Sequence, residues 1–120
     1  MPDPSATWLL YGANGYTGRL IAEEAVRRGM KPLLAGRSAV KVGSLGAALD
    51  CPSRVFSLHD SREIAGHLSG LRAVLHCAGP FSATAAPMMD ACIQAGVHYL
   101  DITGEIPVIE AAAARSQAAR

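Results

Sequence analysis

The chain carries TWLLYGANGYTG at residues 7–18, where an unbroken apolar run ends in three glycines spaced three residues apart. The run at residues 7–11 does not alternate between apolar and polar, which is typical of a strand buried on both faces of a sheet. From Gly18 to Gly29, small and apolar residues recur every three or four positions, and this period predicts a helix with one buried face that ends at Gly29. A buried strand, a glycine turn and an amphipathic helix together predict the first half of a βαβ unit.

The glycine turn has the residue types that a phosphate group requires at the start of a helix. Backbone N–H groups at a helix N-terminus attract anions, provided that no Cβ atom blocks the approach. In the spacing G-x-x-G-x-x-G, a variant of G-x-G-x-x-G, Gly12 permits the tight turn, Gly15 admits a pyrophosphate and Gly18 allows close helix–strand packing. We therefore predict dinucleotide contacts from the whole turn, namely Gly12, Ala13, Asn14, Gly15, Tyr16, Thr17 and Gly18. The alternative is a glycine-rich turn that binds no ligand.

The same alternation of strand and helix continues along the rest of the chain. Further strands are predicted at residues 32–35, 54–58, 72–77 and 97–100. Further helices are predicted at 38–49, from Asp60, around a first turn at Pro87, and from a first turn at Pro107 to the terminus. This order predicts an α/β fold, a Rossmann-type doubly wound parallel sheet of five strands in the order 3-2-1-4-5 with helices on both faces. We expect residues 1–120 to form a single dinucleotide-binding domain.

The outer face of the first predicted helix carries two acid–base pairs at four-residue spacing. They are Glu23 with Arg27 and Glu24 with Arg28, each with the acid first, which is the favourable order on a helix. We expect both pairs to form on the solvent side of the helix.

The end of the second predicted strand distinguishes between the two nicotinamide cofactors. An NAD site places Asp or Glu there to accept a hydrogen bond from the ribose 2′-hydroxyl. Here Arg37 and Ser38 follow Gly36, with Lys41 one turn further along. A guanidinium can form a charge-assisted fork with a 2′-phosphate, which a carboxylate would repel, so the sequence predicts NADP in preference to NAD. The alternative is a solvated arginine beside a serine that only caps the next helix.

The ends of the fourth and fifth predicted strands lie beside the same crevice. Ala78, Gly79 and Pro80 follow the fourth strand, and we predict that their backbone borders the ribose and nicotinamide of the cofactor. His76 and Cys77 precede them and are expected in or near the core. Asp101, Thr103 and Glu105 follow the fifth strand, either as helix caps or beside the substrate. No catalytic residue is assigned.

Composition excludes several other classes of protein. The 120 residues are 50% hydrophobic and 18% charged with a net charge of +1, which argues against disorder, nucleic-acid binding and a membrane surface. No apolar run approaches the roughly 20 residues that a membrane span needs. Three cysteines without a C-x-x-C pair predict neither a disulfide framework nor a metal site, and with no signal peptide at Met1 they indicate the cytoplasm.

Four segments resemble one known family over most of the chain. They are WLLYGANGYTGRLIAEEAVRRG at 8–29, LLAGRS at 33–38, VLHCAGPF at 74–81 and ACIQAGVHYLDITGE at 91–105. Together they resemble the NADP-binding domain of saccharopine dehydrogenase-like oxidoreductases, a group that includes saccharopine reductases and trans-acting enoyl reductases. The resemblance implies that Gly12, Gly15 and Gly18 hold the pyrophosphate, that Arg37 and Ser38 take the 2′-phosphate, and that Gly79 and Pro80 border the nicotinamide.

The resemblance also implies hydride transfer between NADP(H) and an imine, amino-acid-like or enoyl substrate. In that family a second domain supplies most of the substrate site, so the chain would be the N-terminal part of a longer two-domain oxidoreductase. Two alternatives stay open: a non-catalytic module that senses NADP, and an enzyme of the short-chain dehydrogenase or epimerase class. The Tyr-x-x-x-Lys pair of the latter class is absent, since Gly15, Leu20 and Thr103 stand four residues after Tyr11, Tyr16 and Tyr99. The substrate and the oligomeric state, a homo-oligomer included, are left open.

Overall fold

Strands and helices alternate along the chain in the computed structural model, which describes residues 8–79 and 81–102. The five strands are β1 Trp8–Tyr11, β2 Leu33–Gly36, β3 Ser53–Val55, β4 Ala73–His76 and β5 His98–Asp101. The four helices between them are α1 Tyr16–Arg27, α2 Ala39–Leu49, α3 Ser61–Leu68 and α4 Phe81–Ala95. The predictions at Thr7, at Pro80, and from Thr103 through the last helix lie outside the described residues.

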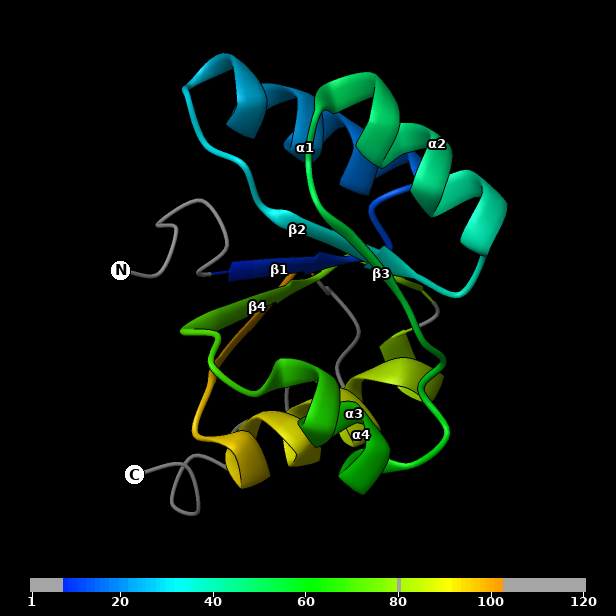
Figure 1. Ribbon diagram of the computed structural model, residues 1–120. Helices are drawn as coiled ribbons and strands as arrows, with labels where there is room; N and C mark the ends of the chain where they lie inside the picture. Colours follow the sequence, from blue (N-terminus) through cyan, green and yellow to red (C-terminus); the bar gives the residue numbers. More distant parts are fainter. Residues whose placement is uncertain (1–7, 80, 103–120) are drawn as a thin grey trace.

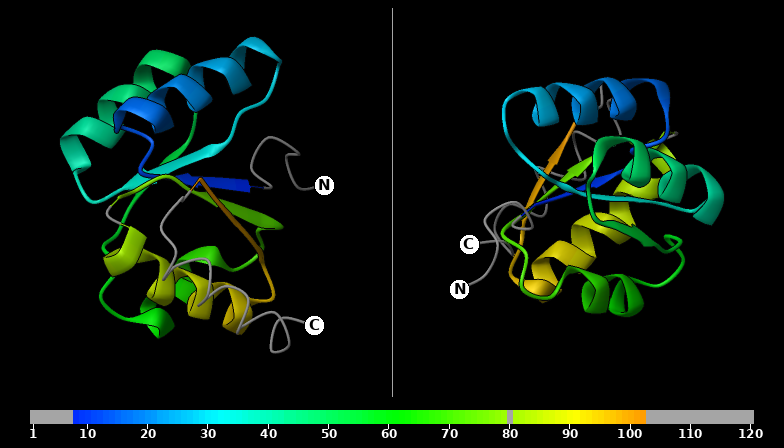
Figure 2. Two further views of the ribbon diagram at one scale, coloured as in Figure 1. Left: turned by 180° about the vertical axis from the view of Figure 1, so that it is seen from behind. Right: turned by 45° about the horizontal axis from the view of Figure 1, so that its top comes forward.

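The five strands form one parallel sheet in the order β3-β2-β1-β4-β5, which confirms the predicted topology. Helices α1 and α2 cover one face of the sheet, and α3 and α4 cover the other (Figures 1 and 2). The strand ends are level, since Tyr11 pairs with Ala35 on one side and with His76 on the other. The crossovers leave β1 and β4 in opposite directions, so the carboxyl ends of these two neighbours form the switch point where such sheets bind ligands.

Each face of the sheet has its own hydrophobic core. On the face under α3 and α4, Leu9 and Val74 pack against the helical residues Ile64, Met88 and Cys92. On the opposite face, a second cluster consists of Leu10, Ala13, Ala22, Leu34 and Leu45. Burial of β1 on both faces explains its continuous apolar run.

Helix α1 follows the predicted pattern in its buried face and at its end. Gly18, Ala22 and Ala25 form the buried face. At the C-terminus the N–H of Met30 donates to the carbonyl of Ala25 at 2.9 Å, while Gly29 has a φ of +84°. These are the features of a Schellman motif, in which a glycine after the last turn adopts the left-handed conformation.

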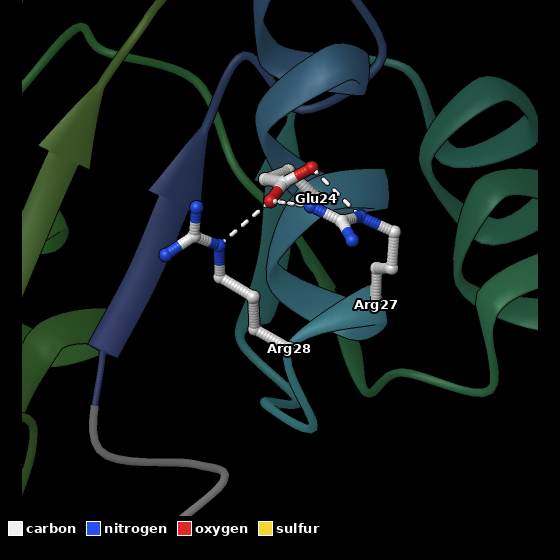
Figure 3. Close-up of polar contacts among 3 residues, drawn as sticks. All are labelled: Glu24, Arg27 and Arg28. Carbon is white, nitrogen blue, oxygen red and sulfur yellow. Dashed lines mark hydrogen bonds and ion pairs between the residues drawn. The ribbon is translucent and has the colours of Figure 1, made fainter.

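The charged side chains on α1 differ from the prediction in one of the two pairs. Glu24 binds Arg28 at 2.6 Å, as its spacing predicts, but it also binds Arg27, whose Nη2 lies 2.5 Å from Oε2 (Figure 3). The prediction of Glu23 with Arg27 is therefore wrong. The i,i+3 and i,i+4 neighbours of one glutamate lie on the same side of the helix, so one carboxylate can serve both arginines.

Two predicted boundaries were also wrong. Pro87 was expected in the first turn of its helix, but α4 begins at Phe81 and Pro87 is inside it. A proline there removes one backbone hydrogen bond, and packing of Met88 and Cys92 in the core favours the continuous helix. Strand β3 ends at Val55 rather than residue 58, although the Phe56 N–H still donates to the Gly36 carbonyl of β2 at 3.1 Å.

Candidate functional site

The turn between β1 and α1 is tied to both neighbouring strands. The N–H groups of Gly12 and Ala13 both donate to the carbonyl of Ala35 in β2, at 2.8 and 3.2 Å. Gly12 has a φ of +81°, and a Cβ there would lie 2.8 Å from the backbone nitrogen of Ala78. A side chain at residue 12 would therefore collide with the backbone that follows β4. The tight turn predicted at Gly12 is confirmed.

The predicted close packing at Gly18 is confirmed as well. Gly18 is buried in the first turn of α1, and a Cβ there would overlap the carbonyl oxygen of Gly12. By contrast, Gly15 is exposed, and a Cβ there would meet the same oxygen at 3.4 Å, an ordinary contact. The helix thus begins against the turn, with its first N–H groups directed at the sheet edge where β1 and β4 end.

A cavity of about 510 Å³ lies at this edge of the sheet, and we call it the switch-point cavity. It is formed by the glycine turn after β1, the end of β2 with the start of α2, and the backbone after β4. Its lining residues are Tyr11, Gly12, Asn14, Gly15, Gly36, Arg37, Ser38, Lys41, Cys77, Ala78 and Gly79.

Most of the residues predicted from the sequence meet in the switch-point cavity, but four do not line it. Ala13 is fully buried in the core beneath the turn, and Gly18 is buried under the Gly12 carbonyl. The Tyr16 side chain is 85% exposed, and Thr17 borders a separate apolar depression beside Trp8. Tyr16, Thr17 and Gly18 can contribute through the first N–H groups of α1, whereas the N–H of Ala13 already donates to Ala35.

The cationic end of the cavity lies where β2 passes into α2. Ser38 caps α2, because its Oγ accepts a hydrogen bond from the N–H of Lys41 at 3.2 Å. Arg37 and Lys41 are exposed, and neither forms an ion pair with any residue that the structure describes. Burial raises the pKa of Tyr11 to about 12, although the nearby charge of Arg37 lowers it. Two cations and a hydroxyl thus surround the space where an anion would enter.

The sequence did not single out three of the lining positions. Gly36 leaves room for the Asn14 side chain and for Val42, since a Cβ there would lie 2.8 Å from Asn14 Oδ1 and from Val42 Cγ2. In the sequence, the signal for this role of Gly36 was a glycine at the end of a predicted strand. Tyr11 and Cys77 complete the wall, and burial, with the charge of Asp101, raises the pKa of the Cys77 thiol to about 11. Cys77 is therefore a neutral thiol near pH 7.

A buried polar chain lies behind the cavity wall after β4. His76 is fully buried, as predicted, and its Nε2 lies 2.9 Å from the hydroxyl oxygen of Thr84. That hydroxyl donates to the carbonyl of Ala78 at 2.7 Å. Burial lowers the pKa of His76 to about 4, although the charge of Asp101 raises it. The imidazole is therefore neutral at physiological pH.

The end of β5 carries a hydrogen-bonded pair of side chains. The Tyr99 hydroxyl donates to Asp101 Oδ2 at 2.7 Å, and Asp101 pairs in register with His76. Burial and this carboxylate both raise the pKa of Tyr99. Within residues 8–79 and 81–102 no three His, Cys, Asp or Glu side chains are grouped to hold a metal ion, and no helix there has the length and apolarity to cross a membrane.

The residues around the switch-point cavity fit a phosphorylated dinucleotide. The backbone at Gly12 and Gly18 packs so closely against Ala78 and against the Gly12 carbonyl that only glycine fits, and this packing places the N-terminus of α1, at Gly15, beside the cavity. Arg37 and Lys41 supply positive charge at the opposite end from Ala78 and Gly79. This donor set suits a ligand with an anion at one end and a pyrophosphate in the middle.

Several solved structures with similar folds are oxidoreductases, and two of them illustrate the likeness. Saccharopine dehydrogenase (L-Glu forming) from Saccharomyces cerevisiae matches with a TM-score of 0.74 at 12% identity, over 87% of this chain and 23% of that one. Triphenylmethane reductase from Citrobacter sp., complexed with NADP(H), matches with a TM-score of 0.71 at 19% identity, over 94% of this chain and 45% of that one. At these identities the likeness shows the fold.

Sequence comparison identifies the family. Trans-acting enoyl reductases of Mycobacterium tuberculosis (strain H37Rv) and Mycobacterium leprae are each 30% identical over 105 residues, 82% of this chain and 25% of theirs. The chain thus spans about a quarter of the length of these relatives. The family model described as the saccharopine dehydrogenase NADP binding domain matches residues 8–120. The chain therefore belongs to the saccharopine dehydrogenase NADP binding domain family.

Proposed function

We propose that the chain is the cofactor-binding domain of an NADP(H)-dependent oxidoreductase. The observation that carries this proposal is the switch-point cavity, where the glycine turn, the Arg37–Lys41 cations and the backbone after β4 surround one space. Family membership supports the same cofactor. Residues 1–120 would then be a single dinucleotide-binding domain at the N-terminal part of a longer polypeptide, as the quarter-length match to the relatives supports.

Each part of the cavity would hold one part of the cofactor. The first N–H groups of α1 would bind the pyrophosphate, because the N–H groups of Gly12, Ala13 and Gly15 already donate to backbone carbonyls. Arg37, Lys41 and the Ser38 hydroxyl would bind the 2′-phosphate. The Ser38 oxygen accepts the capping hydrogen bond from Lys41, and its proton remains available to donate to the phosphate. Ala78, Gly79 and Pro80 would border the nicotinamide.

When bound, NADPH supplies the hydride, and the protein supplies position and electrostatics. The name of the mycobacterial relatives supports an enoyl substrate, and an imine or amino-acid-like substrate is the alternative within the family. We propose that a second domain provides most of the substrate site. The free thiols of Cys51, Cys77 and Cys92 support a reducing compartment, the cytoplasm.

Titration calorimetry with NADPH and NADH tests the cofactor assignment. We expect Arg37→Ala to weaken NADPH binding by about 1–3 kcal/mol, the range for a hydrogen bond to a charged group, and to leave NADH binding unchanged. Arg72→Ala is the matched control, because Arg72 is an exposed arginine at the amino end of β4, on the opposite edge of the sheet. Equal losses of both cofactors in Arg37→Ala would contradict the 2′-phosphate role.

Turnover by the longer polypeptide separates an enzyme from a sensor. NADPH absorbance should decrease when the full-length protein is mixed with an enoyl or imine substrate. Tight NADPH binding without loss of absorbance for any such substrate would favour the non-catalytic module.

A further inference from the structure

We infer that Thr84, held by the buried His76, is a positioning residue that fixes the Ala78 peptide at the nicotinamide end of the switch-point cavity. The inference rests on the proposed function and deepens it. It states that two side chains behind the cavity wall hold in place the backbone that borders the nicotinamide half of the cofactor. Neither residue needs to touch the cofactor.

Three contacts hold the backbone that follows β4. The Cys77 N–H donates to the Tyr11 carbonyl at 2.8 Å and so continues the pairing with β1. The Cα of Gly12 packs against the peptide that joins Cys77 to Ala78. The Thr84 hydroxyl, which belongs to α4, donates to the Ala78 carbonyl at 2.7 Å. The first two contacts come from the end of β1 and the glycine turn, and the third comes from α4, on the other face of the sheet from α1 (Figure 1).

The directions of the hydrogen bonds among His76, Thr84 and Ala78 determine which ring nitrogen of the histidine carries the proton. A threonine hydroxyl has one proton, and that of Thr84 is given to the Ala78 carbonyl. The 2.9 Å contact between His76 Nε2 and Thr84 Oγ1 must then have the histidine as donor. Because burial keeps His76 neutral, its single ring proton is on Nε2. The imidazole therefore donates to the Thr84 oxygen while the Thr84 hydroxyl donates to the Ala78 carbonyl.

The contact matters for binding because it lies where the chain leaves the sheet. Strand β4 ends at His76 and α4 begins at Phe81, so the segment between them has few partners within the sheet. Gly79 is exposed, and a Cβ there would meet nothing within 4 Å. Because this backbone is already ordered, ligand binding does not have to overcome the entropy cost of ordering it. Loss of the Thr84 contact should therefore weaken a ligand that reaches this wall.

Two ligands distinguish this effect from general damage to the site. NADPH fills the whole cavity, whereas adenosine 2′,5′-bisphosphate carries the 2′-phosphate and lacks the nicotinamide half. We expect Thr84→Val to raise the Kd of NADPH about tenfold, the effect of one lost hydrogen bond, with the Kd of adenosine 2′,5′-bisphosphate changed less than about twofold. Thr84→Ser is the matched variant, since it keeps the hydroxyl and should restore NADPH affinity.

The possible results separate the inference from the proposed function. Equal weakening of both ligands by Thr84→Val, or no weakening of NADPH, overturns the positioning role while the proposed function stands. Failure of Thr84→Ser to restore the affinity also overturns it. A native chain that binds neither ligand overturns the proposed function, and this inference with it.

A measurement on the unmodified chain does not depend on how the variants fold. Long-range proton–nitrogen correlation spectra of histidine side chains distinguish the two neutral tautomers. We expect His76 to carry its proton on Nε2 at neutral pH. A proton on Nδ1 alone would mean that Nε2 accepts from Thr84, which then cannot hold the Ala78 carbonyl, and would overturn the inference.

Discussion

The Cα atom of Gly18 lies against the carbonyl group of Gly12, so a methyl group at residue 18 would overlap that oxygen. Because the overlap is with backbone, either α1 or the turn must move to relieve it. We expect Gly18→Ala to lower the free energy of unfolding by about 1–3 kcal/mol, the usual range for overpacking. NADPH binding should be lost with it. Urea denaturation and calorimetric titration measure the two effects.

Gly43→Ala is the control for this substitution, because it makes the same chemical change in a helix with open space around it. A Cβ at Gly43 would meet nothing within 4 Å, and the residue is inside α2. We expect this variant to gain about 0.5–1 kcal/mol, the helix preference for alanine over glycine, and to bind NADPH normally. A Gly18→Ala variant as stable as Gly43→Ala would contradict the close packing of α1 on the turn.

The preference for NADPH over NADH should weaken as salt is added. The side chains of Arg37 and Lys41 are exposed, so their attraction for a 2′-phosphate is open to screening. The Debye length falls from about 30 Å at 0.01 M to about 3 Å at 1 M ionic strength. We expect the ratio of the two Kd values to shrink severalfold over this range in the native chain. It should shrink less in Arg37→Ala, in which Lys41 is the remaining cation of the pair. A ratio independent of salt in the native chain would argue against an electrostatic origin.

The stability of the chain should fall in mild acid because of His76. Its pKa lies at about 4 in the folded state, below the ordinary value of 6.5. Between these two values the unfolded chain binds a proton that the folded chain does not, so the free energy of unfolding decreases as pH falls from 6.5 toward 4. The full loss is about 3 kcal/mol for a shift of this size. Urea denaturation at a series of pH values measures it.

His76→Gln separates this residue from the other groups that titrate in the same range. The glutamine amide can donate to Thr84 as the Nε2 proton does, yet it does not titrate. The decrease in stability between pH 6.5 and pH 4 should be smaller in this variant by most of the His76 contribution. An unchanged pH dependence would show that His76 is not the group responsible.

Sequence reasoning predicted the features that local patterns determine. The buried strand, the glycine turn and the stripe of α1 follow from residue spacing, and the strand order follows the usual order of doubly wound sheets that bind dinucleotides. The prediction that Pro87 lies in the first turn of its helix was wrong. Local preference favours a helix start at a proline, but the packing of Met88 and Cys92 favours a helix that continues through it. Tertiary contacts thus outweighed propensity.

The contacts that sequence could not predict join side chains from different elements. The link from His76 to Thr84 spans eight residues and depends on the angle at which α4 packs on the sheet. The role of Gly36 depends on where Asn14 and Val42 direct their side chains, which no spacing rule specifies.

Gly36 gives the last prediction, because two different neighbours occupy the space of its absent Cβ. Asn14 Oδ1 and Val42 Cγ2 would each lie 2.8 Å from it, but Asn14 is exposed and can turn away, whereas Val42 is fully buried in α2. We expect Gly36→Ala to destabilise the chain by about 1–3 kcal/mol, and clearly less when Val42→Ala has already removed the methyl group. Combination with Asn14→Ala should leave most of the destabilisation in place. Additive effects of Gly36→Ala and Val42→Ala in urea denaturation would show that the close approach of α2 to the end of β2 does not require the glycine.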